Sequence, residues 1–169
     1  MNDLYDPNSR FDPSNKIDET AKIYPNVILG KNNVIGPYSV IGSNGEIRNE
    51  NDFEGRVIIG DNNVISEFVS IQRPKRKGDC TTIGSNNMIM AHSHIGHDST
   101  IHDNCEISTG SIVGGYAVIE SDVKIKIQCT IRNRKIIKSG SVVGMGAVVV
   151  KDVEPNSVVV GNPAKDLIK

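Results

Sequence analysis

The chain has 169 residues, a net charge of −1 and a sequence pI near 6.4. This length fits one domain of ordinary size, and the balanced charge excludes a generally basic nucleic-acid binder or a polybasic membrane protein. The composition also argues against a helical bundle, because 23 Ile and 18 Val stand against only 3 Leu and β-branched residues favour strands.

The chain begins with a stretch that has no repeat, and residues 1–16 are expected to form a capping arm. From Ile17 onward an apolar residue recurs every six positions. Stepping by six from Ile17 to Val149 visits 23 positions, of which only Lys77 is not apolar. A composition that is 37% apolar would place about eight or nine apolar residues there by chance. A period of six belongs neither to a helix nor to a simple alternating strand.

The physical interpretation is a solenoid in which each hexapeptide makes one short strand and one corner. Three strands close a triangular coil of three hexapeptides, so residues i and i+18 stack, and the aliphatic residues point into a narrow axis. Asparagine pairs at 32–33, 62–63 and 86–87 suit corners that need a positive φ. The sequence therefore predicts an all-β domain over residues 17–153, with seven to eight coils and a length of roughly 35 Å.

Two stretches within this domain lose the glycines and small residues of the repeat and carry charge instead. Residues 48–56 and 72–82 are therefore expected to be loops that leave the coil. The second begins QRPKRKG, which places four cations in five residues. From Glu154 onward the six-residue frame ends, so residues 154–169 are expected to form a short C-terminal extension.

Glycine often follows the aliphatic residue of the repeat, as at Gly30, Gly60, Gly84, Gly96 and Gly114. This periodicity resembles that of the hexapeptide-repeat acyltransferases, which fold as a left-handed parallel β-helix. The left hand comes from the resemblance, because the general crossover preference is right-handed. The resemblance also implies a homotrimer with active sites between neighbouring subunits.

All four histidines fall within eleven residues, in MAHSHIGHDSTIH. His97 lies two positions after Ile95, at an expected corner, and faces outward. Asp98 follows it directly, and a carboxylate beside an imidazole can fix its tautomer and stabilise its cation. Gly115 lies three hexapeptides further and is expected to stack one coil above His97, where its bare backbone could approach a thioester and donate an N–H to an oxyanion.

This histidine segment, followed by STGSIVGGYAVI, resembles the active-site region of two groups. One is the UDP-N-acetylglucosamine acyltransferases of lipid A synthesis, and the other is the acetyl-CoA-dependent N-acetyltransferases of nucleotide-linked amino sugars. The resemblance implies that His97 is the general base, Asp98 its orienting partner and Gly115 the amide donor. His94 matches a histidine that lines the acceptor pocket. Tyr116, where the lipid A enzymes carry a histidine, is a further candidate for substrate binding.

The C-terminal segment VVGMGAVVVKDVEPNSVVVGNPAK resembles that of the acetyl-CoA-dependent members. The resemblance implies CoA contacts for Gly144, Ala147 and Lys165, with Lys151 as an addition. Asn133, on the same ladder as His97 and Gly115, is another candidate for contact with CoA. The lipid A enzymes continue into a helical domain that helps bind acyl carrier protein, for which this chain leaves no room. Acetyl-CoA is therefore the expected donor, and an acyl carrier protein donor is the alternative.

The cationic stretch is expected to meet a phosphate. Arg73, Lys75 and Arg76 lie where these transferases extend a loop toward a neighbouring active site, and arginine binds phosphate in a bidentate manner. The acceptor's diphosphate and the 3′-phosphate of CoA are the two candidates.

The sequence thus predicts an acetyltransferase that acts on the amino group, or a hydroxyl, of a nucleotide-linked sugar and needs no metal. Three cysteines without CxxC spacing and the lack of a spanning segment or signal peptide lead us to expect a cytoplasmic location without membrane insertion. The γ-type carbonic anhydrases share the fold and have two histidines spaced like His97 and His102. Their third histidine would fall near Asp61, so that zinc site is not assembled. A catalytically silent scaffold is the remaining alternative.

Overall fold

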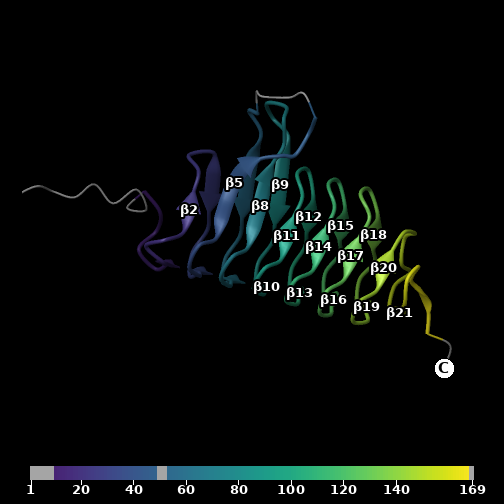
Figure 1. Cartoon of the computed structure of the whole chain (residues 1–169). Coiled ribbons are helices and arrows are strands. Elements are labelled where there is room, and N and C mark those ends of the chain that lie inside the picture. The colour runs from purple at the N-terminus through teal and green to yellow at the C-terminus, as the bar shows by residue number, and fades with distance from the viewer. Residues whose placement is uncertain (1–9, 49–52, 168–169) are drawn as a thin grey trace, which may run out of the picture.

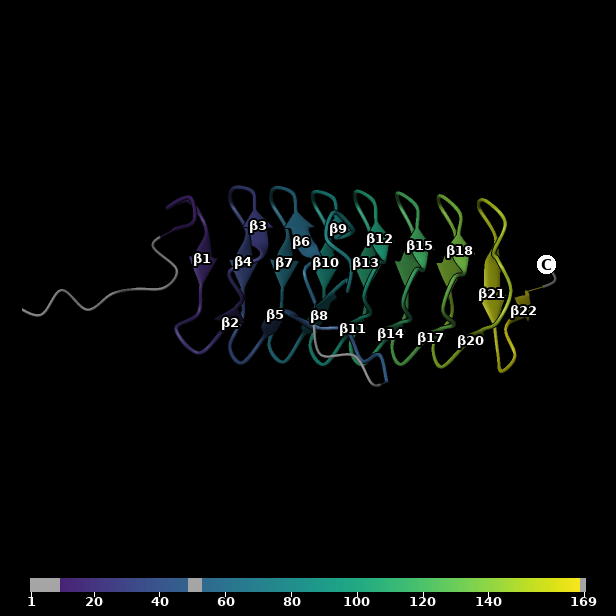
Figure 2. The same ribbon diagram turned by 90° about the horizontal axis from the view of Figure 1, so that it is seen from above.

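The structure, a computed structural model, describes residues 10–48 and 53–167. Short strands repeat along one axis in three parallel sheets, so that the predicted all-β fold, a left-handed parallel β-helix, is confirmed (Figure 1). Seen from above, successive coils follow one another in a single row (Figure 2). The described part of the chain contains no helix long and apolar enough to cross a membrane.

The first sheet has eight parallel strands and one antiparallel strand at its end. These are β1 (Lys16–Ile17), β4 (Val34–Ile35), β7 (Val64–Ile65), β10 (Met88–Ile89), β13 (Glu106–Ile107), β16 (Lys124–Ile125), β19 (Val142–Val143), β21 (Val158–Val160) and the antiparallel β22 (Lys165–Asp166). The second sheet consists of β2 (Lys22–Ile23), β5 (Val40–Asn44), β8 (Ser70–Arg73), β11 (His94–Ile95), β14 (Ile112–Val113), β17 (Thr130–Ile131) and β20 (Val148–Val149). The third sheet consists of β3 (Val27–Leu29), β6 (Arg56–Ile59), β9 (Cys80–Ile83), β12 (Thr100–Ile101), β15 (Val118–Ile119) and β18 (Ile136–Ile137).

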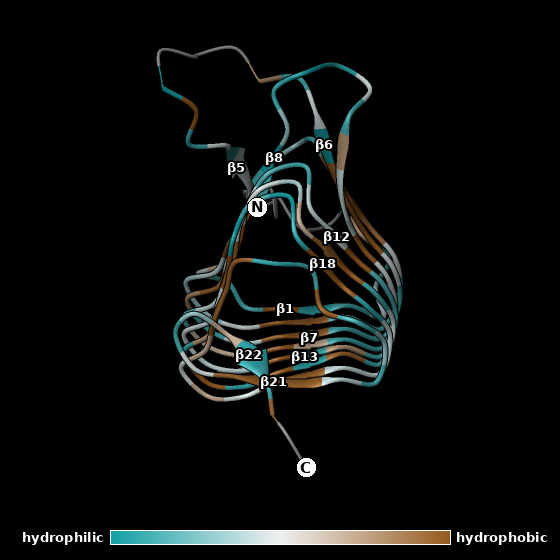
Figure 3. Cartoon of the chain, turned by 90° about the vertical axis from the view of Figure 1, so that its right-hand side faces the viewer, coloured by the Kyte–Doolittle hydropathy of each residue, from teal (hydrophilic) through white to brown (hydrophobic). Residues whose placement is uncertain are grey.

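The interior is a set of aliphatic ladders, one along each sheet. In the second sheet Ile95 stacks on Val113, and Val113 on Ile131, at the expected spacing of three hexapeptides. These side chains are at most 1% exposed. Seen along the axis, the coils form a triangle (Figure 3). Parallel strands buried in this way need no conventional core, because burial of apolar area contributes about 25 cal/mol per Å² along the whole prism.

The asparagine pairs lie at the corner between the third and first sheets, and the two members of each pair have different structural roles. The first member of each pair takes a positive φ, as at Asn32, Asn62 and Asn86, where φ is 57°, 59° and 60°. The second member is buried and forms a ladder: the Asn33 carboxamide oxygen accepts hydrogen bonds from the backbone and side-chain nitrogens of Asn63. The positive φ follows from the asparagine pairs in the sequence, whereas the ladder becomes visible only in the structure.

Two insertions interrupt the regular register, and both lie at the corner between the second and third sheets. We call this corner the site corner. Across the first insertion, between β5 and β6, Val40 pairs with Ser70, five hexapeptides later. Across the second, between β8 and β9, Ser70 pairs with His94, four hexapeptides later. Each excess over the three hexapeptides of a regular coil is a whole number of repeats, which explains why the hexapeptide phase continues through both loops. Figures 1 and 3 show the loops projecting together from this corner.

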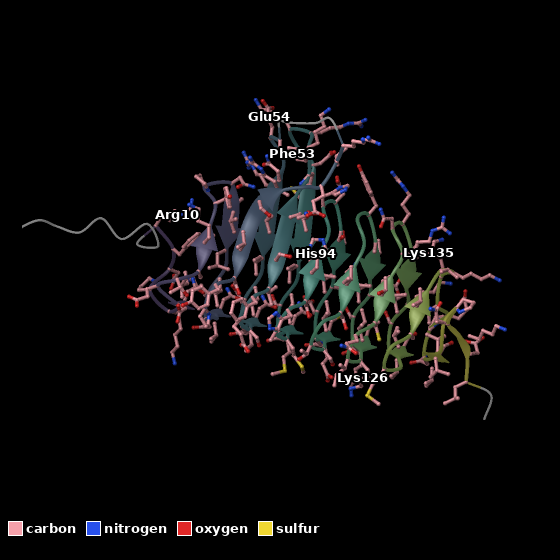
Figure 4. All side chains as sticks on the ribbon, viewed as in Figure 1. Arg10, Phe53, Glu54, His94, Lys126 and Lys135 are labelled. Atoms are coloured by element: carbon pink, nitrogen blue, oxygen red, sulfur yellow. The ribbon has the colours of Figure 1, made fainter. Side chains whose placement is uncertain are left out.

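The second loop is shorter than the residue range expected from the sequence, whereas the first begins earlier than expected, directly after Asn44 of β5. Residues 72–73 still belong to β8, and residues 80–82 belong to β9. Part of the 48–56 range, residues 49–52, lies outside the described residues. Phe53 is buried, and Figure 4 shows it on the projecting loop, not on the prism axis.

Both ends of the β-helix differ in detail from the expected boundaries. Of the expected N-terminal arm, residues 1–9 lie outside the described residues, and Arg10 donates hydrogen bonds to the carbonyls of Ile23 and Tyr24. At the other end the coil continues past residue 153, because β21 pairs in parallel with β19. β22 then turns back against β21. The end of the six-residue frame therefore marks a change of spacing, and the sheet itself continues by one parallel and one antiparallel strand.

Candidate active site

His97 and Asp98 lie in the turn between β11 and β12, at the site corner. His97 Nδ1 and Asp98 Oδ2 are 2.6 Å apart. An ionised carboxylate only accepts hydrogen bonds, so the neutral imidazole carries its proton on Nδ1 and presents Nε2 as a base. Asp98 has a φ of 60°, and its backbone N–H donates to Thr81 Oγ1 at 2.8 Å. The turn thus holds the pair in place.

Two glycines allow backbone to approach the His97 ring closely. A Cβ added at Gly115 would lie 3.0 Å from Nε2, and one added at Gly45 would lie 3.0 Å from Cγ. Tyr116 meets the ring edge-on, with centroids 5.2 Å apart. The His97 side chain is consequently only 14% exposed. As expected, the His97 backbone lies at a corner of the prism. Its ring, however, is enclosed by neighbouring segments and mostly shielded from solvent.

The Gly115 N–H is the amide that the sequence assigned to an oxyanion. Among the hydrogen bonds of residues 10–48 and 53–167 it donates none, whereas Gly114 donates to Ile131 at 2.9 Å and Tyr116 to His97 at 3.0 Å. A Cβ at Gly96 would lie 2.6 Å from the Gly115 nitrogen. Gly115 is buried but lines the cavity beside His97, and the absence of a Cβ at Gly96 leaves room at its unpaired N–H.

Two adjoining cavities run along the second sheet and meet the site corner. The cavity at His97 has a volume of about 380 Å³ and the neighbouring one about 500 Å³. Glu46, Gln72 and His94 line both. The His97 cavity is further lined by Gly96, His97, Ile112, Gly114, Gly115 and Asn133. The larger cavity is further lined by Tyr24, Ser43, Asn44, Ser70 and Arg73.

His94, on β11, lies where the two cavities join, and Figure 4 shows it beside the projecting loops. Its Nδ1 is 2.7 Å from Ser70 Oγ. Burial lowers its pKa from the ordinary value of 6.5, and the facing Glu46 raises it in part. His94 is therefore a neutral hydrogen-bonding group near pH 7, not a charge for binding phosphate.

Of the three predicted phosphate-binding cations, the structure brings only Arg73 to these cavities. Its Nε and Nη2 donate to Asn44 Oδ1 at 3.0 and 2.8 Å. Lys75 and Arg76 line neither cavity. The Lys75 carbonyl accepts a hydrogen bond from Glu54 on the other loop, and Arg76 is exposed on a turn closed by Asp79.

The predicted CoA ligands fall into separate places. Asn133 lines the His97 cavity. Lys151 and Lys165 line another cavity, of about 230 Å³, at the C-terminal end. The strand register places Lys151 on the same ladder as Gly115 and Asn133. Lys151 therefore lies three coils from His97, or about 15 Å at one strand spacing per coil.

The other two predicted CoA ligands have structural roles. A Cβ at Gly144 would meet Val160 Cγ1 at 2.7 Å, so this glycine packs against β21. Ala147 is fully buried inside the prism, and its backbone N–H and carbonyl are hydrogen-bonded to Gly144 and Thr130. The structure gives Ala147 no exposed atom for a cofactor, because its small side chain fills the crowded corner.

Glu46 and Gln72 were missed as site residues. Glu46 belongs to the first insertion, whose path the repeat does not determine, and it reaches the site because that loop folds back over the coils. Gln72 is on β8, directly after Ile71 of the repeat. Gln72 is only 5% exposed. Its place beside the first cation of QRPKRKG was the one local signal available.

A zinc site of the carbonic anhydrase type would need the side chains of His97 and His102 as ligands. His102 follows β12, at the next corner of the prism, whereas His97 precedes that strand. Within the described residues no group of three or more His, Cys, Asp or Glu could hold a metal ion.

Comparison with known proteins agrees with this geometry. The family model described as bacterial transferase hexapeptide (six repeats) matches residues 12–43 and 80–115. The chain thus shares the hexapeptide repeat that this family model describes, over the two matched stretches. The gap between the two matched stretches contains both insertions, where the repeat is interrupted.

Its curated relatives include acyl-[acyl-carrier-protein]–UDP-N-acetylglucosamine O-acyltransferases. That of Pseudomonas paraeruginosa is 36% identical over 111 residues, which are 65% of this chain and 43% of the relative. That of Gloeothece citriformis is 34% identical over 110 residues, 65% of this chain and 40% of the relative. The chain thus matches less than half the length of these relatives.

Among solved structures, the UDP-N-acetylglucosamine acyltransferase of Bacteroides fragilis superimposes with a TM-score of 0.87 at 27% identity, over 91% of this chain and 60% of the other. The perosamine N-acetyltransferase of Caulobacter crescentus, in complex with CoA and GDP-perosamine, gives a TM-score of 0.60 at 18% identity, over 92% of this chain and 57% of the other. At that identity the second likeness concerns the fold alone.

Proposed function

We propose that this protein is an acyltransferase that moves an acetyl group from acetyl-CoA to an amino group or hydroxyl of a nucleotide-linked sugar. The observation that carries the proposal is the arrangement at the site corner: a histidine base with an orienting carboxylate lines the same cavity as an amide that makes no hydrogen bond within the described residues. Acyl transfer needs a proton acceptor and an oxyanion donor close to one reacting carbon.

The steps follow from these positions. His97 Nε2 takes the proton of the acceptor nitrogen or oxygen as that atom attacks the thioester carbonyl. Negative charge develops on the carbonyl oxygen, and the Gly115 N–H donates to it. When the carbon–sulfur bond breaks, the imidazolium returns the proton to the departing thiolate. Asp98 stabilises the imidazolium between these two transfers.

The larger cavity is the proposed binding place of the acceptor. Arg73, already oriented by Asn44, is the cation in that cavity and can meet a diphosphate. Lys151, further along the ladder, is the candidate contact for the CoA phosphates. The His97 cavity lies between these two cations, so donor and acceptor would approach His97 from opposite directions along the axis.

An acyl carrier protein thioester is the second candidate donor, and the relatives named above favour it. A thiol-release assay with acetyl-CoA and with acyl carrier protein thioesters, across a panel of nucleotide-linked sugars, separates the two. Acetyl-CoA turnover supports our proposal. Turnover with carrier-protein thioesters alone would show that the donor is acyl carrier protein and not acetyl-CoA. No turnover with either donor would overturn the proposed function.

We also propose that the protein works as a homotrimer, in the cytoplasm, with sites between neighbouring subunits. In support, the outer faces of the two sheets that meet at the site corner carry exposed apolar side chains at Ile28, Ile112 and Ile136, which a neighbour could cover. Light scattering of the purified chain tests this assembly, and a monomer at micromolar concentration would contradict it.

A further inference from the structure

Glu46 follows the glycine that packs against the His97 ring. The backbone makes a tight turn here, because the Ile47 N–H donates to the Gly45 carbonyl at 3.0 Å. Glu46 is at the centre of this turn and lines both cavities. One cavity is thus lined by the exposed residue Glu46, the base His97 and Gly115, whose N–H makes no hydrogen bond to any residue that the structure describes.

The Glu46 carboxylate is unpaired within the part of the chain that the structure describes. Among those residues no hydrogen bond or ion pair involves its side chain. Arg73 lines the same larger cavity but donates to the neutral Asn44 instead. His94, which faces Glu46, is kept neutral by burial. The two adjoining cavities, which we call the groove, therefore present a negative charge to a molecule that binds beside His97.

We infer that Glu46 binds the attacking group of the acceptor and selects an amine over a hydroxyl, a refinement that rests on the proposed acyl transfer. A neutral amine has two N–H bonds, so it can donate one hydrogen to His97 Nε2 and the other to Glu46. A hydroxyl has one hydrogen, which His97 takes. Its lone pairs would then face the carboxylate, and an unpaired acceptor at a binding site costs affinity.

The chemistry balances for an amine that arrives protonated. Glu46 recognises the ammonium form on binding, and one proton leaves to solvent before attack. The nitrogen–carbon bond then forms as His97 takes the second proton and passes it to the departing thiolate. The third hydrogen stays on the nitrogen, as the N–H of the amide product, hydrogen-bonded to Glu46.

Matched acceptors test this inference directly. The probes are UDP-N-acetylglucosamine and its 3-amino-3-deoxy and 4-amino-4-deoxy counterparts, which differ from it only in the attacking group. The acyl donor is the one that the wild type accepts. The variants are Glu46→Gln, which keeps the shape but removes the charge, and the control Glu19→Gln, on an exposed turn far from the groove.

We expect the wild type to prefer an amino acceptor. In Glu46→Gln the ratio of kcat/KM for that amine to kcat/KM for the hydroxyl should fall about 10- to 100-fold, the size of one charged hydrogen bond. Glu19→Gln should keep the wild-type ratio. Thermal melting of both variants shows that the fold is retained.

The possible failures are distinguishable. A wild type that prefers the hydroxyl, or a ratio that does not change in Glu46→Gln, overturns the role of Glu46 and leaves acyl transfer standing. A wild type that acylates none of the three probes with either donor removes the proposed function, and the role of Glu46 with it.

Discussion

His92 and His97 lie five residues apart in one coil, at successive corners of the prism, and their surroundings differ. His92 has a φ of 60° and is exposed, and it stacks on Phe68 with centroids 4.9 Å apart. Phe68 stacks in turn on Tyr38. We call this the aromatic corner. His97 has a carboxylate on one ring nitrogen and glycine backbone on two sides.

The difference lies in what the neighbouring coils place beside each histidine. At the aromatic corner, the coil before His92 supplies another ring. At the site corner, an insertion brings Gly45 over His97 from two coils away, and the next coil supplies Gly115. The local sequence around each histidine has the same repeat. The role of a corner residue is therefore decided both by its neighbour in the chain, Asp98 in the case of His97, and by residues one or two coils away.

The largest expected effect comes from replacing each of the two histidines by alanine in turn. His97→Ala should lower turnover by about 10²- to 10⁴-fold, because a positioned general base is lost. His92→Ala is the matched control in the same coil and should retain near-normal turnover. Thiol release measures both variants, with light scattering to confirm an unchanged assembly. Near-normal turnover in His97→Ala would remove the base from the mechanism.

Glycine variants compare the two corners in the same way. Gly115→Ala should lower turnover about 10²- to 10³-fold, because its Cβ would lie 3.0 Å from Nε2 and crowd the oxyanion position. Gly110→Ala, at the aromatic corner, has a φ of 71° and only Gln128 within 4 Å. It should lower the Tm through backbone strain and leave turnover unchanged. Equal kinetic effects in the two variants would contradict a special role for Gly115.

The corner between the third and first sheets has neither role, and its variants should affect stability alone. Asn63 donates to the Gly84 carbonyl and to Asn33, and it accepts from the Asn87 backbone. Asn63→Ala should cost about 2–3 kcal/mol of unfolding free energy, since buried partners lose their hydrogen bonds. Asn62→Gly, at the adjacent positive-φ position, should be close to neutral. Denaturant titration measures both, and a neutral Asn63→Ala would show that the ladder is dispensable.

The smallest expected effect is a pH dependence that His94 introduces. Burial places the pKa of folded His94 below 6.5, so the unfolded chain takes up this proton first as the pH falls. Stability due to the neutral His94 is therefore present above about pH 6.5 and is lost below it. His94→Gln should show a smaller decrease of Tm between pH 7 and pH 5 than the wild type. An identical decrease would mean that other groups cause it.

Much of the fold could be predicted because every coil repeats the same pattern of inward-facing aliphatic residues. The six-residue spacing of Ile and Val fixes which side chains enter the axis, and the stacking of every third hexapeptide follows from three strands per coil. The pairing of Gly115 with His97 was available from that spacing alone. The coil that continues to β21 was missed, because Val142 pairs there with Val158, a spacing that is not a multiple of six, and the frame no longer applies.

The candidate site was less predictable where insertions contribute to it. Ala147 lies in a glycine-rich segment that suggests a ligand, but the prism needs its small side chain inside. Lys75 and Arg76 look like partners of Arg73 by sequence, yet neither lines the cavities that Arg73 reaches. Glu46 has no repeat position that marks it, whereas Gln72 follows Ile71 of the repeat, at the position that is glycine after Ile95.

The sequence by itself therefore determined the strands, the axis, the stacking register and the ladder of His97 and Gly115, because these depend on spacing along a periodic chain. Only the tertiary structure decided how the insertions fold back, and the first of them placed Gly45 against the His97 ring and Glu46 in the cavities beside it. A loop outside the repeat has no periodic constraint, and its path depends on the surface that it packs against.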